Sequence, residues 1–555
     1  MRTVRDAAFD VLRLHGLTTL FANPGSTEVA LLSDLPDDLD FVLALHEGSV
    51  VGAATGWALA RSEPALVLLH TTAGLGNAVG ALATARENRA PLVVLVGQQD
   101  RRHLAQEPFL AGRLAGLAGD YPVRLETPVR AQDVPGAIGR AAHAARVGRG
   151  PALVIVPMDD WAQPADGLPV PAPSTLRQAT GVDTGAVREV AALLDAAASP
   201  ALVVGAGADD AVTWRALTAL AERLRCPVWQ EPFGARAGFP QDHPLFAGHL
   251  PAERGRLRAA LAPYDLVLAV GAPVLRQNLY EDGPLAGDGT RLAVVTDDPA
   301  EAQRAPVELA VVAPLPAFCG ELAAGVRDRS GAPMPVLGRP AAPRPPREGE
   351  ELRAAQVLAA LAERLPAHTV LVEETPSSRP DLHALVPARQ PLGFLSAAQG
   401  GLGFALPAAI GIRMAVPERP VVAVVGDGSS LYQIQSLWTA AHYGVGALFV
   451  VLANGRYAVM DQLADRHGGK PPWPAFEEVS VCGLARSLGC PARRVTGRAA
   501  LLAELDTLLP DLAHRTAPLL LEVAVRPDRP LAPDARAASG SRPALDPRPA
   551  PEELA

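Results

Sequence analysis

The chain has 555 residues, and its composition, 49% hydrophobic and 20% charged, is that of a globular protein with about three domains. A net charge of −9 and the lack of a basic run argue against a nucleic-acid binder. No stretch is long enough for a membrane span, the N-terminus lacks the apolar core of a signal peptide, and the four cysteines show no C-x-x-C spacing. We therefore expect a cytoplasmic protein that binds neither nucleic acid nor membrane.

Strands and helices alternate in the first third of the chain. Residues 17–22, 40–45, 65–69 and 91–96 are short apolar runs that predict strands, and the small residues of 48–61 predict a helix. This alternation predicts a mostly parallel, doubly wound α/β sheet. The carboxyl ends of parallel strands lie at one edge of a sheet, which is where open α/β sheets bind ligands.

Polar side chains of catalytic type follow the ends of all four predicted strands, namely Ser26, Glu47, His70 and either Gln98 or Gln99. Each has a simpler explanation when taken alone. Ser26 could cap a helix, Glu47 could favour a helix N-terminus, and His70 could be a hydrogen-bonded structural histidine. Their repetition at one predicted edge favours a shared site.

Three motifs in this region resemble a known family. They are FANPGS at residues 21–26, LALHE at 43–47 and H-x-x-AG-x-GN at 70–77, and they are similar to the pyrimidine-binding domain of the benzoylformate decarboxylases, a branch of the thiamine-diphosphate (ThDP) enzymes. The likeness extends over most of the chain, to Val525. It implies three doubly wound domains: a pyrimidine-binding domain at residues 1–165, a central domain and a diphosphate-binding domain.

The resemblance assigns roles to individual residues of this first domain. Glu47 matches the glutamate that hydrogen-bonds a ring nitrogen of the cofactor's aminopyrimidine, which promotes loss of the thiazolium C2 proton. Ser26 and His70 match residues that contact the substrate carboxylate and relay protons, and Asn77 is a candidate for the substrate pocket. The adjacent histidine pair of pyruvate and indolepyruvate decarboxylases is missing, because residues 100–103 read DRRH.

A proline-rich linker at residues 164–180 leads to a second α/β pattern, the central domain at 181–327. Its predicted strands are residues 201–204, 266–270, 292–295 and 309–312. The glycines of residues 205–207 could form a dinucleotide-binding turn, but no acidic ribose contact is evident on a following strand. We prefer a structural domain without a nucleotide, and the alternative stays open because some relatives hold FAD here.

One loop of the central domain departs from the family pattern. Residues 271–280 align with the segment that sends a histidine into the active site of benzoylformate decarboxylases, and this chain has Asn278 at that position. Asparagine donates and accepts hydrogen bonds but cannot carry a proton near neutral pH. Protonation of the enamine intermediate would then depend on His70, on water or on another group, which leaves the reaction's outcome open.

After a linker at residues 328–350, the third domain runs over 351–525 and is organised around residues 421–460. Apolar runs at 421–425 and 447–452 predict two buried parallel strands. The helix predicted between them has its apolar positions at Leu431, Ile434, Leu437 and Ala441. This βαβ unit places the residues that follow each strand at one edge of the sheet.

Asp427 and Asn454 follow these two strands. Both offer hard oxygen atoms, which suit Mg²⁺, and Gly426 and Gly428 let backbone N–H groups approach a phosphate. Taken alone, Gly-Asp-Gly could be a tight turn in which the aspartate caps a helix. Together with Asn454 it resembles the diphosphate-and-metal motif of ThDP enzymes, which implies Asp427, Asn454 and the backbone carbonyl of Arg456 as metal ligands.

The resemblance also assigns cofactor and substrate contacts in this domain. Leu402, in the run GGLGFALP, matches the bulky residue that wedges the cofactor into its bent form, although it could simply pack in a turn. The other residues predicted to bind the cofactor are Thr375, Ser377, Gly401, Gly426, Gly428, Ser429 and Tyr457. Met460 and Leu463 join Asn77 and Asn278 as pocket candidates, with core packing as the alternative. Residues 526–555 are poor in apolar residues, so we expect a disordered tail.

The leading interpretation is a ThDP- and Mg²⁺-dependent enzyme that decarboxylates a hydrophobic or aromatic 2-oxo acid to an aldehyde, through a C2 ylid and an enamine. The alternatives are a carboligase or lyase that makes or cleaves 2-hydroxy ketones, and an inactive cofactor-binding subunit of a synthase. Glu47 and the metal site lie in different domains, which in this family come from different subunits. We therefore expect a homodimer or homotetramer with active sites at the subunit interface.

Overall fold

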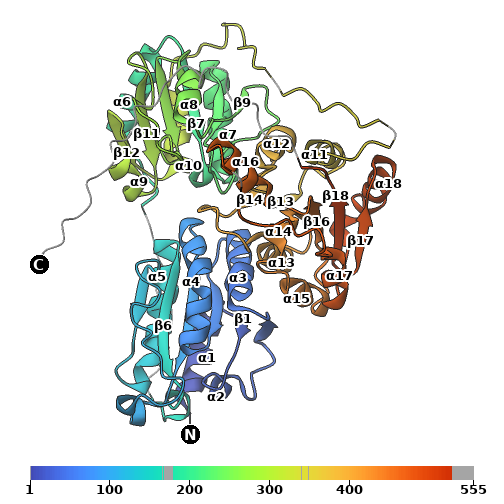
Figure 1. The fold of residues 1–555 in the computed structure, drawn as a ribbon. Helices are drawn as coiled ribbons and strands as arrows, with labels where there is room; N and C mark the ends of the chain where they lie inside the picture. Colours follow the sequence, from blue (N-terminus) through green and yellow to red (C-terminus); the bar gives the residue numbers. More distant parts are fainter. Residues whose placement is uncertain are drawn as a thin grey trace, which may run out of the picture.

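The computed structural model describes residues 2–165, 167, 179–338, 340–347, 349–469 and 471–527. The described chain forms three α/β domains, each built on its own six-stranded sheet (Figure 1). Neighbouring strands within these sheets pair in parallel. The predicted fold class is therefore confirmed. The residue boundaries predicted for the domains stay predictions, and residues 528–555 of the predicted tail lie outside the described part of the chain.

The first sheet has the strand order β2-β1-β3-β4-β6-β5. Its strands are β1 (Thr19–Asn23), β2 (Asp40–Leu43), β3 (Ala65–Leu69), β4 (Leu92–Gln98), β5 (Arg124–Glu126) and β6 (Pro151–Pro157). The helices are α1 (Val4–Leu14), α2 (Val29–Leu32), α3 (Glu47–Arg61), α4 (Thr71–Glu87) and α5 (Val134–Gly148). Every residue of β3, β4 and β6 is buried, as expected for parallel strands covered on both faces.

The central sheet has the order β12-β11-β10-β7-β8-β9. Its strands are β7 (Pro200–Val204), β8 (Val228–Gln230), β9 (Phe246–His249), β10 (Leu266–Val270), β11 (Arg291–Thr296) and β12 (Leu309–Val312). The helices are α6 (Thr184–Ala196), α7 (Ala211–Leu224), α8 (Arg254–Leu261), α9 (Pro299–Arg304) and α10 (Leu315–Gly325). The described residues of the predicted linker at 328–350 form neither helix nor strand.

The third sheet has the order β14-β13-β15-β16-β18-β17. Its strands are β13 (Val370–Glu374), β14 (Phe394–Ser396), β15 (Val421–Gly426), β16 (Leu448–Ala453), β17 (Ala492–Val495) and β18 (Leu519–Ala524). The helices are α11 (Ala354–Ala362), α12 (Arg379–Leu385), α13 (Ala405–Ala415), α14 (Asp427–Ser430), α15 (Ser436–His442), α16 (Ala458–Arg466), α17 (Val481–Ser487) and α18 (Arg498–Leu508). Short 3₁₀ turns are η1 (Arg101–Gln106), η2 (Ala131–Asp133), η3 (Asp160–Ala162), η4 (Ala206–Ala208) and η5 (Leu512–His514).

One predicted helix is interrupted. Apolar spacing predicts a helix through Leu431 and Ala441, but α14 ends at Ser430 and α15 begins only at Ser436. In the turn between them, the side-chain oxygen of Gln433 accepts a hydrogen bond of 2.6 Å from the Ser49 hydroxyl in the first domain. The break thus serves a contact between domains, which the periodicity of one segment cannot reveal.

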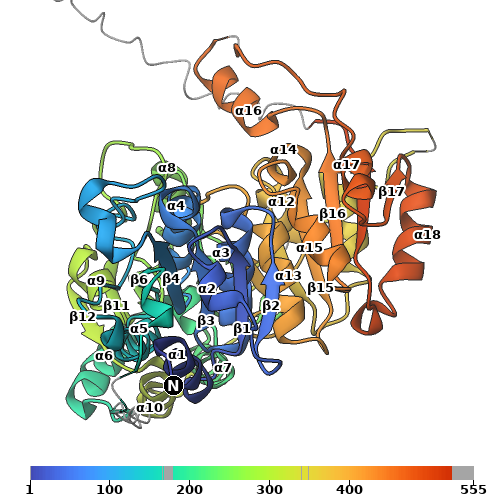
Figure 2. The same ribbon diagram turned by 90° about the horizontal axis from the view of Figure 1, so that it is seen from below.

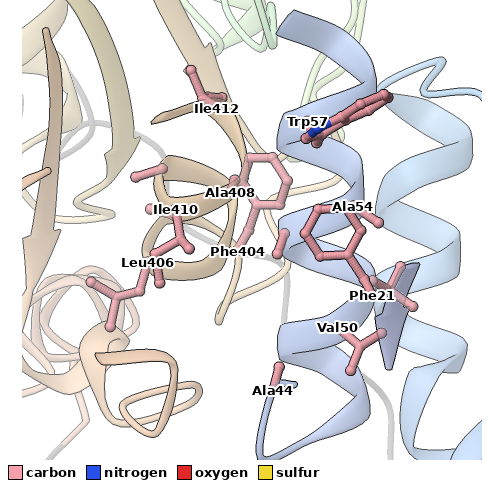
Figure 3. Close-up of a cluster of buried hydrophobic side chains, with 14 of the residues drawn as sticks. Phe21, Ala44, Val50, Ala54, Trp57, Phe404, Leu406, Ala408, Ile410 and Ile412 are labelled. Atoms are coloured by element: carbon pink, nitrogen blue, oxygen red, sulfur yellow. The ribbon is translucent and has the colours of Figure 1, made fainter. Parts of the chain in front are cut away.

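The first and third domains pack through α3 and α13, and Figure 3 shows the apolar side chains where the two helices face each other. A side chain at Gly56 would place its Cβ 2.1 Å from the carbonyl oxygen of Ala408, and one at Gly411 would lie 1.8 Å from that of Ala53. Reciprocal glycines therefore let the two helices meet at backbone distance. This packing fixes the start of α3, where Glu47 lies, relative to the third domain.

The central domain is tied to both of its neighbours by polar contacts. The carboxylate of Asp297 pairs with Arg89 at 2.8 Å and with Arg149 at 2.5 Å, both in the first domain. Asp209 accepts a hydrogen bond of 2.9 Å from the backbone amide of Leu392 in the third domain. Across the described helices, none has the length and apolar character that a membrane crossing requires.

Candidate active site

The first sheet brings the predicted strand-end residues to one edge. Its strands β2, β1, β3 and β4 are consecutive neighbours, so the segments that follow them lie side by side. Glu47 is the first residue of α3, and its side chain is buried. One carboxylate oxygen accepts a hydrogen bond of 3.0 Å from Asn23 Nδ2, and the other accepts one of 3.1 Å from Asn77 Nδ2. The two amides hold the carboxylate in place from either side.

Two of these contacts differ from what the sequence suggests. Asn23 lies in the FANPGS motif, but its role as a partner of Glu47 is not evident from the motif alone. Asn77, which we placed among the pocket candidates, instead donates to Glu47 in this structure. Both asparagines therefore support the predicted activating acid.

His70 lies between the end of β3 and the start of α4. Its Nδ1 atom is 3.0 Å from Glu28 Oε2 and 3.0 Å from Thr27 Oγ1. Glu28 is 1% exposed and was not singled out in the sequence. Ser26, by contrast, is exposed on the same turn.

The end of β4 holds a neighbouring loop through Gln98. Gln98 ends β4, and its side chain bonds both the amide and the carbonyl of Gly112, at 3.1 and 2.7 Å. Arg101 donates two hydrogen bonds, of 2.6 and 2.7 Å, to the carboxylate of the buried Asp160. The DRRH segment thus anchors the surrounding loop through Arg101.

The third sheet forms a second edge, where β14, β13, β15 and β16 are neighbours. Asp427 begins α14 directly after β15, and it accepts hydrogen bonds from Gly428 N at 2.9 Å and from Gly455 N at 2.6 Å. Burial raises the pKa of the Asp427 carboxyl, while these amide donors act in the opposite direction. Asn454 Oδ1 accepts from the amide of Arg456 at 3.0 Å, within the same turn. The turn that carries Asn454 and Arg456 therefore lies against Asp427, and their role as metal ligands remains a prediction.

This arrangement fits a hard divalent cation and a diphosphate. A carboxylate, a side-chain amide and a backbone carbonyl are oxygen donors of the kind that Mg²⁺ takes when phosphate oxygens supply the rest. The guanidinium of Arg456 is turned aside, because its Nε bonds Asp461 at 3.0 Å. In the described part of the chain, no group of three His, Cys, Asp or Glu side chains is placed to hold a metal by itself.

Leu402 lies in a turn that a buried carboxylate holds. Glu374, the last residue of β13, accepts hydrogen bonds from the amides of Gly403, Phe404 and Ala405 at 2.6, 2.8 and 2.7 Å. It thereby caps the N-terminus of α13, where a negative charge is favourable. Burial raises the pKa of Glu374 to about 7. Leu402 is half-buried at the end of this capped turn, and Gly401 beside it is exposed.

The remaining cofactor candidates lie along the same edge. Thr375 follows β13 and donates its hydroxyl to Glu373 at 2.8 Å, and Ser377 is half-buried one turn further on. Ser429 is buried in α14, next to Gly428. These positions share the edge with Asp427, and their contact with a cofactor remains a prediction.

Two aromatic rings cover Gly428. A Cβ atom at Gly428 would lie 3.1 Å from Cζ of Phe476 and 3.3 Å from Cε1 of Tyr457. The two rings meet edge to face with centroids 5.2 Å apart. Tyr457 was predicted as a cofactor contact, whereas Phe476 was missed, because nothing in the sequence marks the later segment as returning to this turn.

The helix after Tyr457 does not pack into the core. Figure 2 shows α16 projecting beyond α14, away from the sheet. Ala458 is its buried residue, while Met460 is 41% exposed and Leu463 is half-buried. Met460 is therefore not packed in the core of this chain, and the part of Met460 and Leu463 in a substrate pocket remains a prediction.

The pocket candidate of the central domain is Asn278, and its part in the site remains a prediction. Asn278 is exposed on the loop after β10, and none of the described hydrogen bonds joins it to Glu47, His70 or Asp427. The glycines of residues 205–207 are used internally: a Cβ at Gly205 would lie 2.8 Å from that of Ala272, and one at Gly207 would lie 2.9 Å from Gly271. That close approach by itself requires glycine at both positions.

The two edges come from different domains of the chain. Among the hydrogen bonds of the described residues, Glu47 is joined to Asn23 and Asn77, and none reaches Asp427 or Asn454. The link between the two domains near this point is Gln433, which contacts Ser49 and His46 on either side of Glu47. One chain therefore presents two half-sites.

Two edges of this kind, one with a buried glutamate and one with an aspartate and an asparagine beside a glycine turn, define a thiamine-dependent enzyme. Family models agree: the thiamine pyrophosphate enzyme N-terminal TPP binding domain matches residues 2–112, the central domain 187–322, and the C-terminal TPP binding domain 377–523. The chain belongs to the thiamine pyrophosphate enzymes, and its cofactor is thiamine diphosphate. The predicted family is thus confirmed.

Individual relatives are similar over nearly the whole chain. Benzoylformate decarboxylase of Pseudomonas aeruginosa is 38% identical over 553 residues, which cover 96% of this chain and 100% of the relative. The solved 4-hydroxybenzoylformate decarboxylase of Rhodococcus jostii RHA1 has a TM-score of 0.89 at 36% identity, covering 95% of this chain and 100% of that one. Benzoylformate decarboxylase of Polynucleobacter necessarius has a TM-score of 0.90 at 34% identity, covering 96% and 100%.

Proposed function

We propose that this enzyme decarboxylates a hydrophobic or aromatic 2-oxo acid to an aldehyde, with thiamine diphosphate and Mg²⁺. The observation that carries the proposal is the likeness, over nearly the whole chain, to decarboxylases named for benzoylformate and 4-hydroxybenzoylformate. The chain keeps Glu47, Asp427 and Asn454 at the matching edges, which argues against an inactive subunit.

The edge of the third domain would bind the metal and the diphosphate, and the edge of the first domain would activate the cofactor and transfer protons. Thiamine diphosphate, when bound, would supply an electron sink for the pair that is left on the substrate as CO₂ departs. Asp427, Asn454 and the Arg456 carbonyl hold the metal and, through it, the diphosphate. Glu47, held by its two asparagines, bonds the aminopyrimidine ring. His70 moves a proton at the substrate.

We further propose that the active site is completed by a second copy of the chain, in a homodimer or homotetramer. Glu47 lies in the first domain and Asp427 and Asn454 lie in the third, and in this family those two domains come from different subunits at one site, which supports this. Large apolar side chains also remain exposed on the described surface, among them Phe109, Tyr280 and Tyr432. Aromatic side chains are enriched in the buried cores of subunit interfaces.

A second candidate function is a carboligase or lyase acting on 2-hydroxy ketones. Asn278 favours it, because an amide cannot deliver the proton that ends decarboxylation with a free aldehyde. An aldehyde could then react in place of that proton, which would form a carbon–carbon bond.

One assay separates these functions. Apo-protein reconstituted with thiamine diphosphate and Mg²⁺ is given a panel of aliphatic and aromatic 2-oxo acids, and CO₂, aldehyde and hydroxyketone are measured. CO₂ and aldehyde from an aromatic acid support the decarboxylase. Hydroxyketone formed from two aldehydes without CO₂ supports the carboligase. The Glu47→Gln variant keeps the fold and loses either activity, and wild-type rates in that variant would contradict the role of Glu47.

A further inference from the structure

The carboxylate of Glu28 lies against the imidazole of His70 inside the first domain. Glu28 Oε2 is 3.0 Å from His70 Nδ1 and also accepts a hydrogen bond of 2.7 Å from the backbone amide of Gly25. Glu28 is 1% exposed, whereas the His70 side chain is 14% exposed. A buried carboxylate is stable only when it is paired or hydrogen-bonded, so this contact is part of how Glu28 is accommodated.

The surrounding backbone is shaped to admit this pair. A Cβ at Gly97 of β4 would lie 1.7 Å from Glu28 Oε1, so any side chain there would displace the carboxylate. A Cβ at Gly25 would lie 2.5 Å from Cγ and Nδ1 of His70, so the ring rests directly on that glycine. Thr71, the next residue after His70, has φ of +33°, which is strained for a β-branched side chain. Such strain is maintained where the surrounding structure requires one orientation of the chain.

The contacts fix which nitrogen of the ring carries a proton. A carboxylate only accepts hydrogen bonds, so Nδ1 must donate to Glu28. The hydroxyl of Thr27 donates to Glu28 Oε1, which leaves its oxygen, 3.0 Å from Nδ1, as a second acceptor. Nε2 is then the nitrogen left to exchange protons with a substrate.

We propose that Glu28 is a positioning residue that orients His70 and fixes its tautomer, so that His70 presents Nε2 to the substrate. Glu28 also stabilises the imidazolium that forms when Nε2 takes up a proton, as a carboxylate beside a catalytic histidine does elsewhere. Glu28 acts through His70 and does not itself touch the substrate. This proposal rests on the proposed function, which gives His70 a proton to move.

The charge environment of His70 is simple on the described residues. Glu28, from the turn before α2, is the charged group in contact with the ring. Gly25, Thr27 and Gly74 also lie against His70, and none of them titrates. The Glu28–His70 pair is therefore the charged contact that replacing Glu28 changes.

The test is a double-mutant cycle of Glu28→Gln and His70→Ala on the cofactor-loaded enzyme. Glu28→Gln should lower kcat by roughly 10- to 100-fold with little change in KM, because an amide does not fix the tautomer. In a plot of kcat against pH, the limb that reports loss of the imidazolium proton should also shift to lower pH in Glu28→Gln. The double variant should be no slower than His70→Ala alone. Losses that multiply, or an unchanged pH profile, would overturn the proposal.

Controls separate this from a loss of folding. Glu522→Gln replaces another buried, hydrogen-bonded glutamate, which contacts Cys482 N and Arg494 in the third domain and not His70, and it should keep kcat. Thr27→Val removes only the hydroxyl and should give a smaller loss in kcat than Glu28→Gln. A drop in kcat for Glu522→Gln as large as that for Glu28→Gln would overturn the proposal.

A readout on cofactor-free protein keeps this test independent of the proposed reaction. Diethylpyrocarbonate acylates a neutral imidazole nitrogen, and mass spectrometry of the peptide that contains His70 measures the rate. The pH of half-maximal modification should be lower in Glu28→Gln than in the wild type, and identical curves would overturn the pairing. If the wild type turns over no substrate, the proposed function fails while this comparison still decides the proposal on Glu28.

Discussion

The carboxylate of Asp427 accepts a hydrogen bond of 2.6 Å from the backbone amide of Gly455, which joins the ends of β15 and β16. Gly455 has φ of +66°, a conformation that glycine adopts without strain. The bond brings the Asn454 turn against the aspartate, so the two predicted metal ligands lie beside each other. We regard this contact as the basis of the diphosphate half-site.

Asp427→Asn should weaken thiamine diphosphate binding in the presence of Mg²⁺. The amide keeps the size of the side chain but lacks its charge, and a bond to a charged group is worth about 2 to 3 kcal/mol, or roughly 100-fold in affinity. Calorimetric titration of apo-protein measures this. Asp461→Asn is the control. Asp461 lies on α16 and bonds the side chains of Arg456 and Trp473, so this variant should leave the affinity within about threefold. Equal affinity for Asp427→Asn and the wild type would refute the assigned ligand.

Glu374 should make the stability of the enzyme depend on pH. Burial raises its pKa from the ordinary value of 4.5 to about 7, so the folded state holds a proton that the unfolded state has lost in this interval. Its contribution to stability is therefore fully present below pH 4.5 and is lost as pH rises through about 7. Glu374→Gln cannot titrate. The free energy of unfolding of the wild type should fall relative to this variant by up to roughly 3 kcal/mol between these limits.

Urea denaturation of both proteins across this pH range is the measurement. Glu231 and Asp209 also have pKa values raised by burial, to about 7 and about 6, but they are present in both proteins and cancel in the difference. Parallel stability curves for the wild type and Glu374→Gln would contradict the raised pKa.

Two inactive variants should restore activity in each other's presence. If the active site combines Glu47 of one chain with Asp427 of another, a Glu47→Gln chain paired with an Asp427→Asn chain has one intact site and one site with both defects. Random mixing at equal amounts then gives about 25% of wild-type activity in a symmetric dimer. The unfractionated mixture should show this activity, and the mixed dimer isolated with two affinity tags after co-expression should show about 50%, because one of its two sites is intact. No recovery in the mixed dimer would place the whole site within one chain.

Asn278→His should raise the rate of decarboxylation. An imidazole supplies the proton that asparagine cannot, and general acid catalysis at this step is worth roughly 100-fold or more when well positioned. Aldehyde release measures the change, and Asn278→Gln is the control because it alters size without adding a titratable group. A histidine variant no faster than the glutamine variant would show that the proton comes from elsewhere.

The sequence predicted the fold and the two edges because both depend on local features. Buried parallel strands are continuous apolar runs, and the polar residues that end them must share an edge once the strands are neighbours. Glu28 was missed for the opposite reason. Its contact with His70 depends on Gly97, on a different strand, leaving room for the carboxylate. The break between α14 and α15 was missed because its cause, the contact of Gln433 with Ser49, crosses two domains.

The most direct test of the central claim is the product balance on an aromatic 2-oxo acid. Apo-protein is reconstituted with thiamine diphosphate and Mg²⁺, benzoylformate is added, and CO₂, benzaldehyde and hydroxyketone are measured in one reaction, with omission of each cofactor as the control. The account predicts equal amounts of CO₂ and benzaldehyde, only when both cofactors are present. Absence of CO₂ release from benzoylformate and from every other 2-oxo acid in the panel would contradict it.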